Sequence, residues 1–227
     1  MLKKKNKNFN VIIRYSSMSG IKLTVLLPLL NQLLRDVIAT PAESQYVLIL
    51  CHSAIRCSEF EGFLKELFTF CADVIDIVDI YSGDKVENAL RLKQATAAPS
   101  DADDLKASIK ARCKVLLSTP TQFLDLITSK KVPAQLLCSS LFVDKVDMHI
   151  ALDLSSELVK IAETAKLEPK FKTIITSQFK GASENDQEQV IKKAFMGEQK
   201  ALIIQINEDN RVKSKCKHKH THTHQYV

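Results

Sequence analysis

Glycine is scarce in this 227-residue chain, which has 5 glycines and no tryptophan. Glycine is thus about 2% of the residues, against about 7% in average proteins. A loop that cradles phosphates with several glycines is therefore not expected in its usual form. Long apolar runs are also absent, since Val25–Leu30 is far too short to cross a bilayer. These absences exclude a membrane bundle, and we expect no membrane partner.

The six cysteines show none of the paired spacings that are typical of metal ligands. Most of them lie in or beside apolar runs, where cysteine behaves as a small hydrophobic residue. The basic start of the chain is not followed by an apolar stretch long enough for a secretory signal. A reducing, intracellular compartment is the simplest interpretation.

The excess positive charge, +6 overall, is concentrated at the two ends of the chain. We predict a basic N-terminal end over residues 1–8 and a disordered Lys/His-rich tail over residues 208–227. Such runs contact phosphates weakly and are more often only solvated. The alternating histidines from His218 to His224 suggest a metal site. The lysines among them oppose a cation, so a low-complexity tail is favoured.

Short β-branched runs alternate with stretches of helical period in the rest of the chain. The predicted strands are Val11–Ile13, Tyr46–Leu50, Val74–Ile80, Lys114–Leu117, Leu141–Val143, Thr173–Thr176 and Ala201–Ile206. The predicted helices are Thr24–Val37, Ser58–Phe70, Lys85–Gln94, Thr121–Thr128, Leu152–Ala165 and Asp186–Phe195. Repeated strand–helix–strand units bury a mostly parallel sheet between two helical layers. The pattern predicts one α/β domain over residues 9–207.

Small and polar residues follow several predicted strands, where parallel α/β sheets bind their ligands. Residues 10–30 read as a strand, a small-residue loop and a helix, which is the order of a phosphate-binding loop. Three later junctions read Ser118–Gln122, Leu141–Asp147 and Ile174–Phe179. Taken in this order, the junctions resemble the motifs of the first RecA-like domain of DEAD-box RNA helicases.

The stretches Phe68–Ala72 and Lys193–Asn207 resemble one branch of that family, the nucleolar helicases that assist assembly of the large ribosomal subunit. The resemblance implies a three-layer, RecA-like fold of the P-loop NTPase type, with ATP and Mg²⁺ as cofactors. It implies pre-ribosomal RNA and ribosome-assembly proteins as partners, a second RecA-like domain elsewhere, and a location in the nucleus and nucleolus.

The resemblance also assigns roles to individual residues. The nucleotide-binding candidates are Ser17, Ser19, Gly20, Lys22 and Thr24, and the metal candidates are Asp144 and Asp147. The RNA-binding candidates are Thr119, Pro120 and Gln122, and Ser177 is the candidate that couples nucleotide state to RNA binding.

The chain departs from the family pattern at three of these motifs. Gly20 is the one glycine left in the loop, and Lys22 comes one residue later than the family lysine, a rotation of about 100° at a helix start. Lys145 replaces the glutamate that positions the attacking water, and an ammonium cannot accept a proton at neutral pH. Gln122 replaces an arginine, which removes a charge-assisted phosphate contact.

Two of the candidates also have plainer interpretations. Asp144 is as well explained as a strand-end aspartate that caps the next turn, and Thr119 as the N-cap of the following helix.

These departures favour a degenerate or truncated helicase-like domain that has no ATPase activity alone and binds RNA or ribosome-assembly partners. No catalytic residue is assigned with Lys145 in the glutamate position. The alternative is a fragment of an active ATP-dependent RNA helicase in ribosome biogenesis. An unrelated nucleotide-binding α/β protein is a third interpretation.

Overall fold

The computed structural model describes residues 10–15, 21–39, 44–69, 72, 74–80, 109–110, 113–129, 136–164, 172–177, 186–197, 201–206 and 212–214. The strands are β1 (Asn10–Tyr15), β2 (Ser44–Leu50), β3 (Asp76–Asp79), β4 (Cys113–Ser118), β5 (Leu136–Val143), β6 (Lys172–Ser177), β7 (Ala201–Ile206) and β8 (Val212–Ser214). The helices are α1 (Ile21–Ala39), α2 (Ala54–Leu67), α5 (Pro120–Thr128), α6 (Val146–Ala151), α7 (Ser155–Thr164) and α8 (Asp186–Met196).

The strands form one eight-stranded sheet in the order β3-β4-β2-β5-β6-β1-β7-β8. All neighbours pair in parallel except β8, which runs antiparallel to β7. β2, β5, β6 and β1 lie next to one another at the centre, so their carboxyl ends share one edge of the sheet. The predicted mostly parallel α/β sheet is confirmed.

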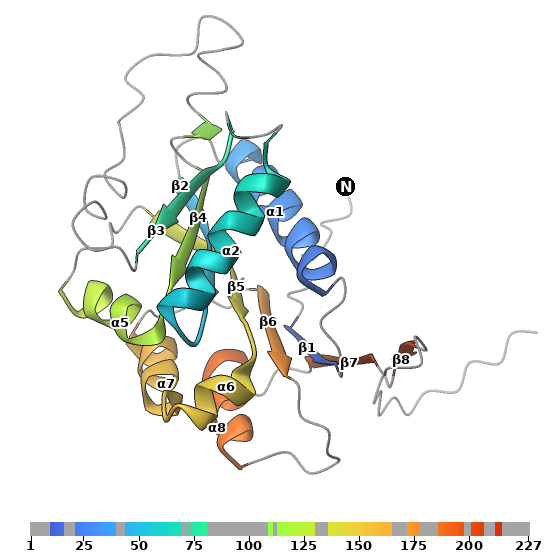
Figure 1. Cartoon of the computed structure of the whole chain (residues 1–227), viewed down its shortest axis with the longest axis vertical. Helices are drawn as coiled ribbons and strands as arrows, with labels where there is room; N and C mark the ends of the chain where they lie inside the picture. The colour runs from blue at the N-terminus through green and yellow to red at the C-terminus, as the bar shows by residue number, and fades with distance from the viewer. Residues whose placement is uncertain are drawn as a thin grey trace, which may run out of the picture.

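Helices cover both faces of the sheet, as Figure 1 shows. One face packs against α1 and α2, and the other against α5, α6, α7 and α8. Successive strand residues alternate between the two cores: Leu48 and Leu50 face one, and Val47 and Ile49 the other. Burial of both faces explains why the strands read as continuous apolar runs rather than as an alternating pattern.

The seven predicted strands are confirmed, and five of the six predicted helices coincide with α1, α2, α5, α7 and α8. The sixth, Lys85–Gln94, lies outside the described residues. α2 begins at Ala54, earlier than predicted, because Ser53 is its N-cap and accepts a hydrogen bond from the Arg56 N–H at 3.3 Å. The short helix α6 was not predicted.

The chain end needs one correction. Val212–Ser214 lies inside the stretch predicted to be a disordered tail, yet it forms β8 and pairs with β7 from Ile206 to Ile204. The rest of that stretch, and the basic end over residues 1–8, lie outside the described residues.

Three of the cysteines are core residues. Cys51, Cys57 and Cys113 are fully buried, and all three carry free thiols. This burial confirms the prediction that cysteine acts here as a small hydrophobic residue. Within the described ranges, no helix is both long and apolar enough to cross a membrane.

Candidate functional site

The carboxyl edge of the sheet is extended by backbone hydrogen bonds just beyond the strand ends. The Asp144 N–H donates to the Leu50 carbonyl at 3.0 Å, and the Cys51 N–H donates to the Ser118 carbonyl at 3.0 Å. These bonds fix the residues that follow β2 and β5. Asp144 therefore lies in a defined position near the middle of this edge.

Asp144 forms a buried ion pair with a residue of α2. Arg56 Nε donates to Asp144 Oδ2 at 2.7 Å, and the two side chains are 8% and 2% exposed. Arg56 Nη1 also donates to Glu59 Oε2 at 2.7 Å, and the guanidinium lies 5.0 Å from the centroid of the Phe60 ring. Burial lowers the pKa of Arg56, but the bonds and charges of Asp144 and Glu59 outweigh it and raise that pKa overall.

Thr176, at the end of β6, connects the acidic motif to the neighbouring strand. Its Oγ1 accepts a hydrogen bond from the Lys145 N–H at 2.8 Å. The same hydroxyl lies 3.4 Å from both Asp144 Oδ1 and the Val143 carbonyl oxygen, either of which can accept its proton. Thr176 is fully buried. Sequence reasoning missed it and chose the next residue, Ser177.

Lys145 has a left-handed backbone, with φ 54° and ψ 66°, and it is the N-cap of α6 without a side-chain cap bond. This conformation is uncommon for a residue with a Cβ and costs on the order of 1–2 kcal/mol. The Asp144 side chain, directed to Arg56, does not cap α6, so that plainer interpretation of Asp144 is wrong.

Tyr15 and Asp147 complete the charged neighbourhood. Tyr15, the last residue of β1, is 3% exposed. Burial first, and then the negative charges of Asp144 and Asp147, raise its pKa well above the usual range. Asp147 is half-buried in the first turn of α6. Two carboxylates, Asp144 and Asp147, thus lie near a tyrosine that stays neutral, and the buried Arg56 is the cation that pairs with Asp144.

Two histidines lie beside this cluster. The His52 and His149 rings meet edge to face, with centroids 6.1 Å apart. His149 is fully buried, and neither of its ring nitrogens has a hydrogen-bond partner among the described residues. Burial, reinforced by the charge of His52, lowers the pKa of His149 to about 3. The backbone groups of Leu50 and Asp144 lie near the ring and act to raise that pKa, but neither makes a hydrogen bond of good geometry. Burial is also the main cause that lowers the pKa of His52.

Two of the five predicted nucleotide-binding residues lie in the part of the chain that the structure describes. Ser17, Ser19 and Gly20 lie outside the described residues. Lys22 and Thr24 belong to the first turns of α1, and the Thr24 side chain is exposed. Their assignment to nucleotide binding therefore stays a prediction.

The predicted RNA-binding residues form the start of α5. Thr119 is the N-cap of that helix, and its Oγ1 accepts from the Gln122 N–H at 3.5 Å. The same hydroxyl donates to the Gln122 side-chain oxygen at 2.8 Å. Pro120 occupies the first helical position, where a missing N–H costs nothing. The capping role of Thr119 is confirmed, and RNA contact by these three residues stays a prediction.

Ser177 is the last residue of β6 and pairs with Arg14 of β1. Its place at the carboxyl edge agrees with the predicted one. The coupling role stays a prediction.

The residues around Asp144 do not fit a magnesium ion. Mg²⁺ prefers oxygen ligands and usually keeps several waters. Asp144 is 1% exposed, and its carboxylate is in contact with the Arg56 guanidinium, so a hydrated dication would meet a positive charge in a closed space. Within the described ranges, no three histidine, cysteine or acidic side chains are placed to hold a metal.

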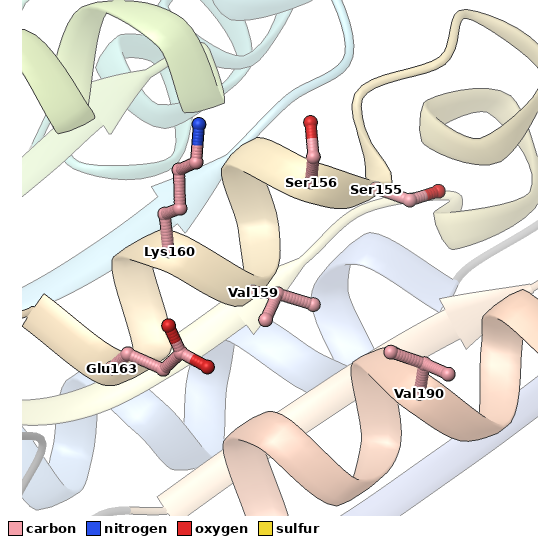
Figure 2. A pocket seen from close by; sticks show the side chains of 6 residues that line it. All are labelled: Ser155, Ser156, Val159, Lys160, Glu163 and Val190. Atoms are coloured by element: carbon pink, nitrogen blue, oxygen red, sulfur yellow. The ribbon is translucent and has the colours of Figure 1, made fainter.

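A shallow groove lies between α7 and α8 at the surface (Figure 2). It has a volume of about 370 Å³, and its residues are Ser155, Ser156, Val159, Lys160, Glu163 and Val190. Val159 and Val190 face one another across it from the two helices. None of its residues belongs to the Asp144 cluster or to the predicted site.

Three solved structures show the same fold. A DEAD box protein from the hyperthermophile Methanococcus jannaschii matches with a TM-score of 0.58 and 14% identity, over 89% of this chain and 46% of that one. The RNA-helicase Prp28 from Chaetomium thermophilum bound to ADP matches at 0.50 and 20%, over 82% and 39%. The DEAD-box helicase Mss116 bound to ssRNA and UDP-BeF matches at 0.53 and 13%, over 91% and 38%.

At these identities the likeness concerns the fold, which is that of a helicase RecA-like domain, as predicted. The chain spans less than half the length of each of these structures. No protein-family model matches the chain, and neither does any curated protein.

Proposed function

We propose that this chain is a helicase-like RecA domain that does not hydrolyse ATP by itself and that acts by binding RNA or ribosome-assembly proteins in the nucleolus. The buried Arg56–Asp144 ion pair is the observation that carries the proposal. RNA binding is supported by the shared fold with Mss116, whose structure contains ssRNA. The nucleolus and the ribosome-assembly partners rest on the sequence resemblance.

The absence of hydrolysis follows from what phosphoryl transfer needs. A metal ion must neutralise the developing charge on the phosphate oxygens, and a residue must position the attacking water. Asp144 is neutralised by Arg56 and is closed to solvent. Lys145 stands at the next position, and its ammonium cannot accept a proton from water. Both requirements are therefore unmet at this edge.

RNA binding is proposed at the start of α5, through Thr119, Pro120 and Gln122. These residues are half-buried or buried at the carboxyl edge, and the Thr119 cap holds the first turn rigid. Pro120 has no N–H and the Gln122 N–H donates to Thr119 Oγ1, so the attraction for phosphate oxygens at this helix start comes mainly from the positive end of the helix dipole. Such contacts position the RNA backbone without reading the bases.

The proposed lack of ATP hydrolysis is tested by mixing the full chain with ATP and Mg²⁺, with and without single-stranded RNA, and measuring the phosphate released. We expect no release above the protein-free blank. We expect the same for Lys145→Glu, which restores the family glutamate but leaves Asp144 paired with Arg56. Hydrolysis that Asp144→Asn abolishes would contradict the proposal.

The RNA part is tested by fluorescence anisotropy with a labelled single-stranded RNA. We expect Gln122→Ala to weaken binding several-fold, whereas Thr121→Ala, an exposed neighbour on the same helix, leaves it unchanged. Equal affinities for the two variants would contradict the placement at α5. A chain that binds no RNA at low salt would remove this part of the proposal.

The alternative is that the chain is part of an active ATP-dependent RNA helicase. It is favoured by one observation, the coverage of less than half of each helicase structure that it matches. Transcript sequencing separates the two. A reading frame that continues into a second RecA-like domain supports the alternative, and one that ends with this chain supports the first proposal.

A further inference from the structure

Arg56 is held in one position from several sides. Its own helix supplies Glu59, which accepts a hydrogen bond from Nη1 at 2.7 Å, and Phe60, whose ring lies 5.0 Å from the guanidinium. The third contact comes from residue 144, which lies 88 positions further along the chain and accepts from Nε at 2.7 Å. A planar guanidinium with this many fixed contacts has little freedom to leave.

Asp144 is satisfied to the same degree. Oδ2 accepts from Arg56, and Oδ1 lies 3.4 Å from the Thr176 hydroxyl. Its backbone N–H donates to the Leu50 carbonyl at 3.0 Å. Both carboxylate oxygens therefore face a donor of the protein itself, and a cation from solvent would have to displace a buried guanidinium to reach them.

We infer that Arg56 is the resident counterion of Asp144 and takes the place of a divalent cation at the carboxyl edge of the sheet. The edge is consequently complete without Mg²⁺, and its structure does not change when Mg²⁺ is added or removed. The inference also restricts how a phosphate group can bind at this edge, because no metal ion can bridge the phosphate to Asp144. The inference rests on the same ion pair as the hydrolysis part of the proposed function, and it holds whether the partner is RNA or a protein. Metal binding measured without ATP lets the two fail separately.

Mn²⁺ titration followed by electron paramagnetic resonance tests the inference directly, because Mn²⁺ replaces Mg²⁺ at carboxylate sites and its free form is counted from the spectrum. We expect the full-length wild-type chain and Asp144→Asn to bind the same amount of Mn²⁺ up to millimolar concentrations. Mn²⁺ that is bound equally by both lies away from Asp144 and supports the inference. Mn²⁺ that the wild type binds and Asp144→Asn does not would overturn it.

Arg56→Gln provides the gain-of-binding test. The substitution removes the cation and keeps a shorter polar side chain that ends near the position of the Arg56 Nε, so Asp144 becomes a buried carboxylate without a counterion. We expect this variant to bind about one additional equivalent of Mn²⁺, since one carboxylate is released. We also expect Mg²⁺ to raise its unfolding temperature by several degrees. Arg56→Gln/Asp144→Asn is the matched control and gains neither.

A folded Arg56→Gln that binds no more Mn²⁺ than the double variant would overturn the inference, because Arg56 would not be what excludes the metal. Circular dichroism establishes whether the variant folds. If Arg56→Gln does not fold, the comparison of the wild type with Asp144→Asn decides alone.

Discussion

Two buried polar clusters lie side by side at the carboxyl edge of the sheet. They differ in whether their polar groups have hydrogen-bond partners. In the Arg56–Asp144–Thr176 cluster each side chain has a partner at 2.7–3.4 Å. In the His52–His149 pair, three ring nitrogens have no partner among the described residues. Arg56 and Asp144 can be buried with their charges because each is the counterion of the other. His149 stays neutral because a charged imidazole at its position would be buried without a counterion.

This contrast determines which groups can respond to solvent. The Arg56 guanidinium stays in contact with the Asp144 carboxylate unless the cluster opens. A buried histidine without partners resists protonation until the protein opens. The charges at this edge are therefore set by the protein's own residues. Substitutions can remove either cluster while the other is kept.

The largest effect is expected from breaking the ion pair. Arg56→Met leaves Asp144 as an unpaired buried carboxylate and should cost about 3–5 kcal/mol of unfolding free energy. Arg56→Met/Asp144→Leu removes both charges and should recover most of that loss, since apolar replacements of buried pairs are often neutral. Urea unfolding of both variants provides the comparison. A loss of under about 1 kcal/mol for Arg56→Met would show that the pair is not buried in solution.

The histidine pair should make stability depend on pH. The folded pKa of His149 is about 3, below its ordinary value of 6.5, so the unfolded chain binds the proton more readily. The contribution is fully present above pH 6.5 and is lost as the pH falls from 6.5 toward 3. We expect a loss on the order of 1 kcal/mol per pH unit within this window. Urea unfolding at several pH values measures it.

The matched control for this dependence is His149→Phe, which keeps an aromatic ring against His52 and cannot take up a proton. Other acidic and basic groups titrate equally in both proteins, so the difference between the two curves isolates His149. Parallel curves for the wild type and His149→Phe would mean that the imidazole is solvated or partnered in the folded state.

A smaller effect is expected at Thr176. Thr176→Val removes the hydroxyl that accepts from the Lys145 N–H, and an unpaired buried N–H costs about 1–3 kcal/mol. Thr176→Ser retains the hydroxyl and should lose less. Thermal unfolding ranks the two variants, and a Thr176→Ser that is the less stable of the two would show that the methyl group matters more than the hydroxyl.

The smallest effect, and the one gain, is expected at Lys145. Lys145→Gly relieves a left-handed backbone of φ 54° and should stabilise the chain by up to about 1 kcal/mol, because glycine adopts this region without cost. Lys145→Ala keeps the Cβ and should give no such gain. Thermal unfolding measures both, and an equal response to glycine and alanine would contradict the left-handed assignment.

The sheet was predictable because its signal is local. Each strand is a short, largely apolar run, and all six residues of β4 are buried because helices cover both faces of the sheet. The order of small-residue junctions then indicated a RecA-like fold. By contrast, α6 has six residues, which are too few to show a helical period. The left-handed residue before it is Lys145 rather than a glycine, so the sequence does not indicate the turn.

The contacts that define the site could not be predicted in the same way. Arg56 and Asp144 are 88 residues apart, and nothing near either residue indicates the other. Thr176 was not selected from the sequence, because its contacts with Asp144 and Lys145 arise from the pairing of β6 with β5. The start of α2 could have been predicted from the sequence, because serine, here Ser53, is a common capping residue.

Calorimetric titration of the full chain with ATP, in the presence and absence of Mg²⁺, tests the central claim most directly. If Arg56 holds the place of the metal at Asp144, Mg²⁺ changes the affinity for ATP by the same factor in the wild type and in Asp144→Asn. Micromolar binding that requires Mg²⁺ and disappears in Asp144→Asn would contradict the account, because a metal would then have displaced Arg56 from Asp144.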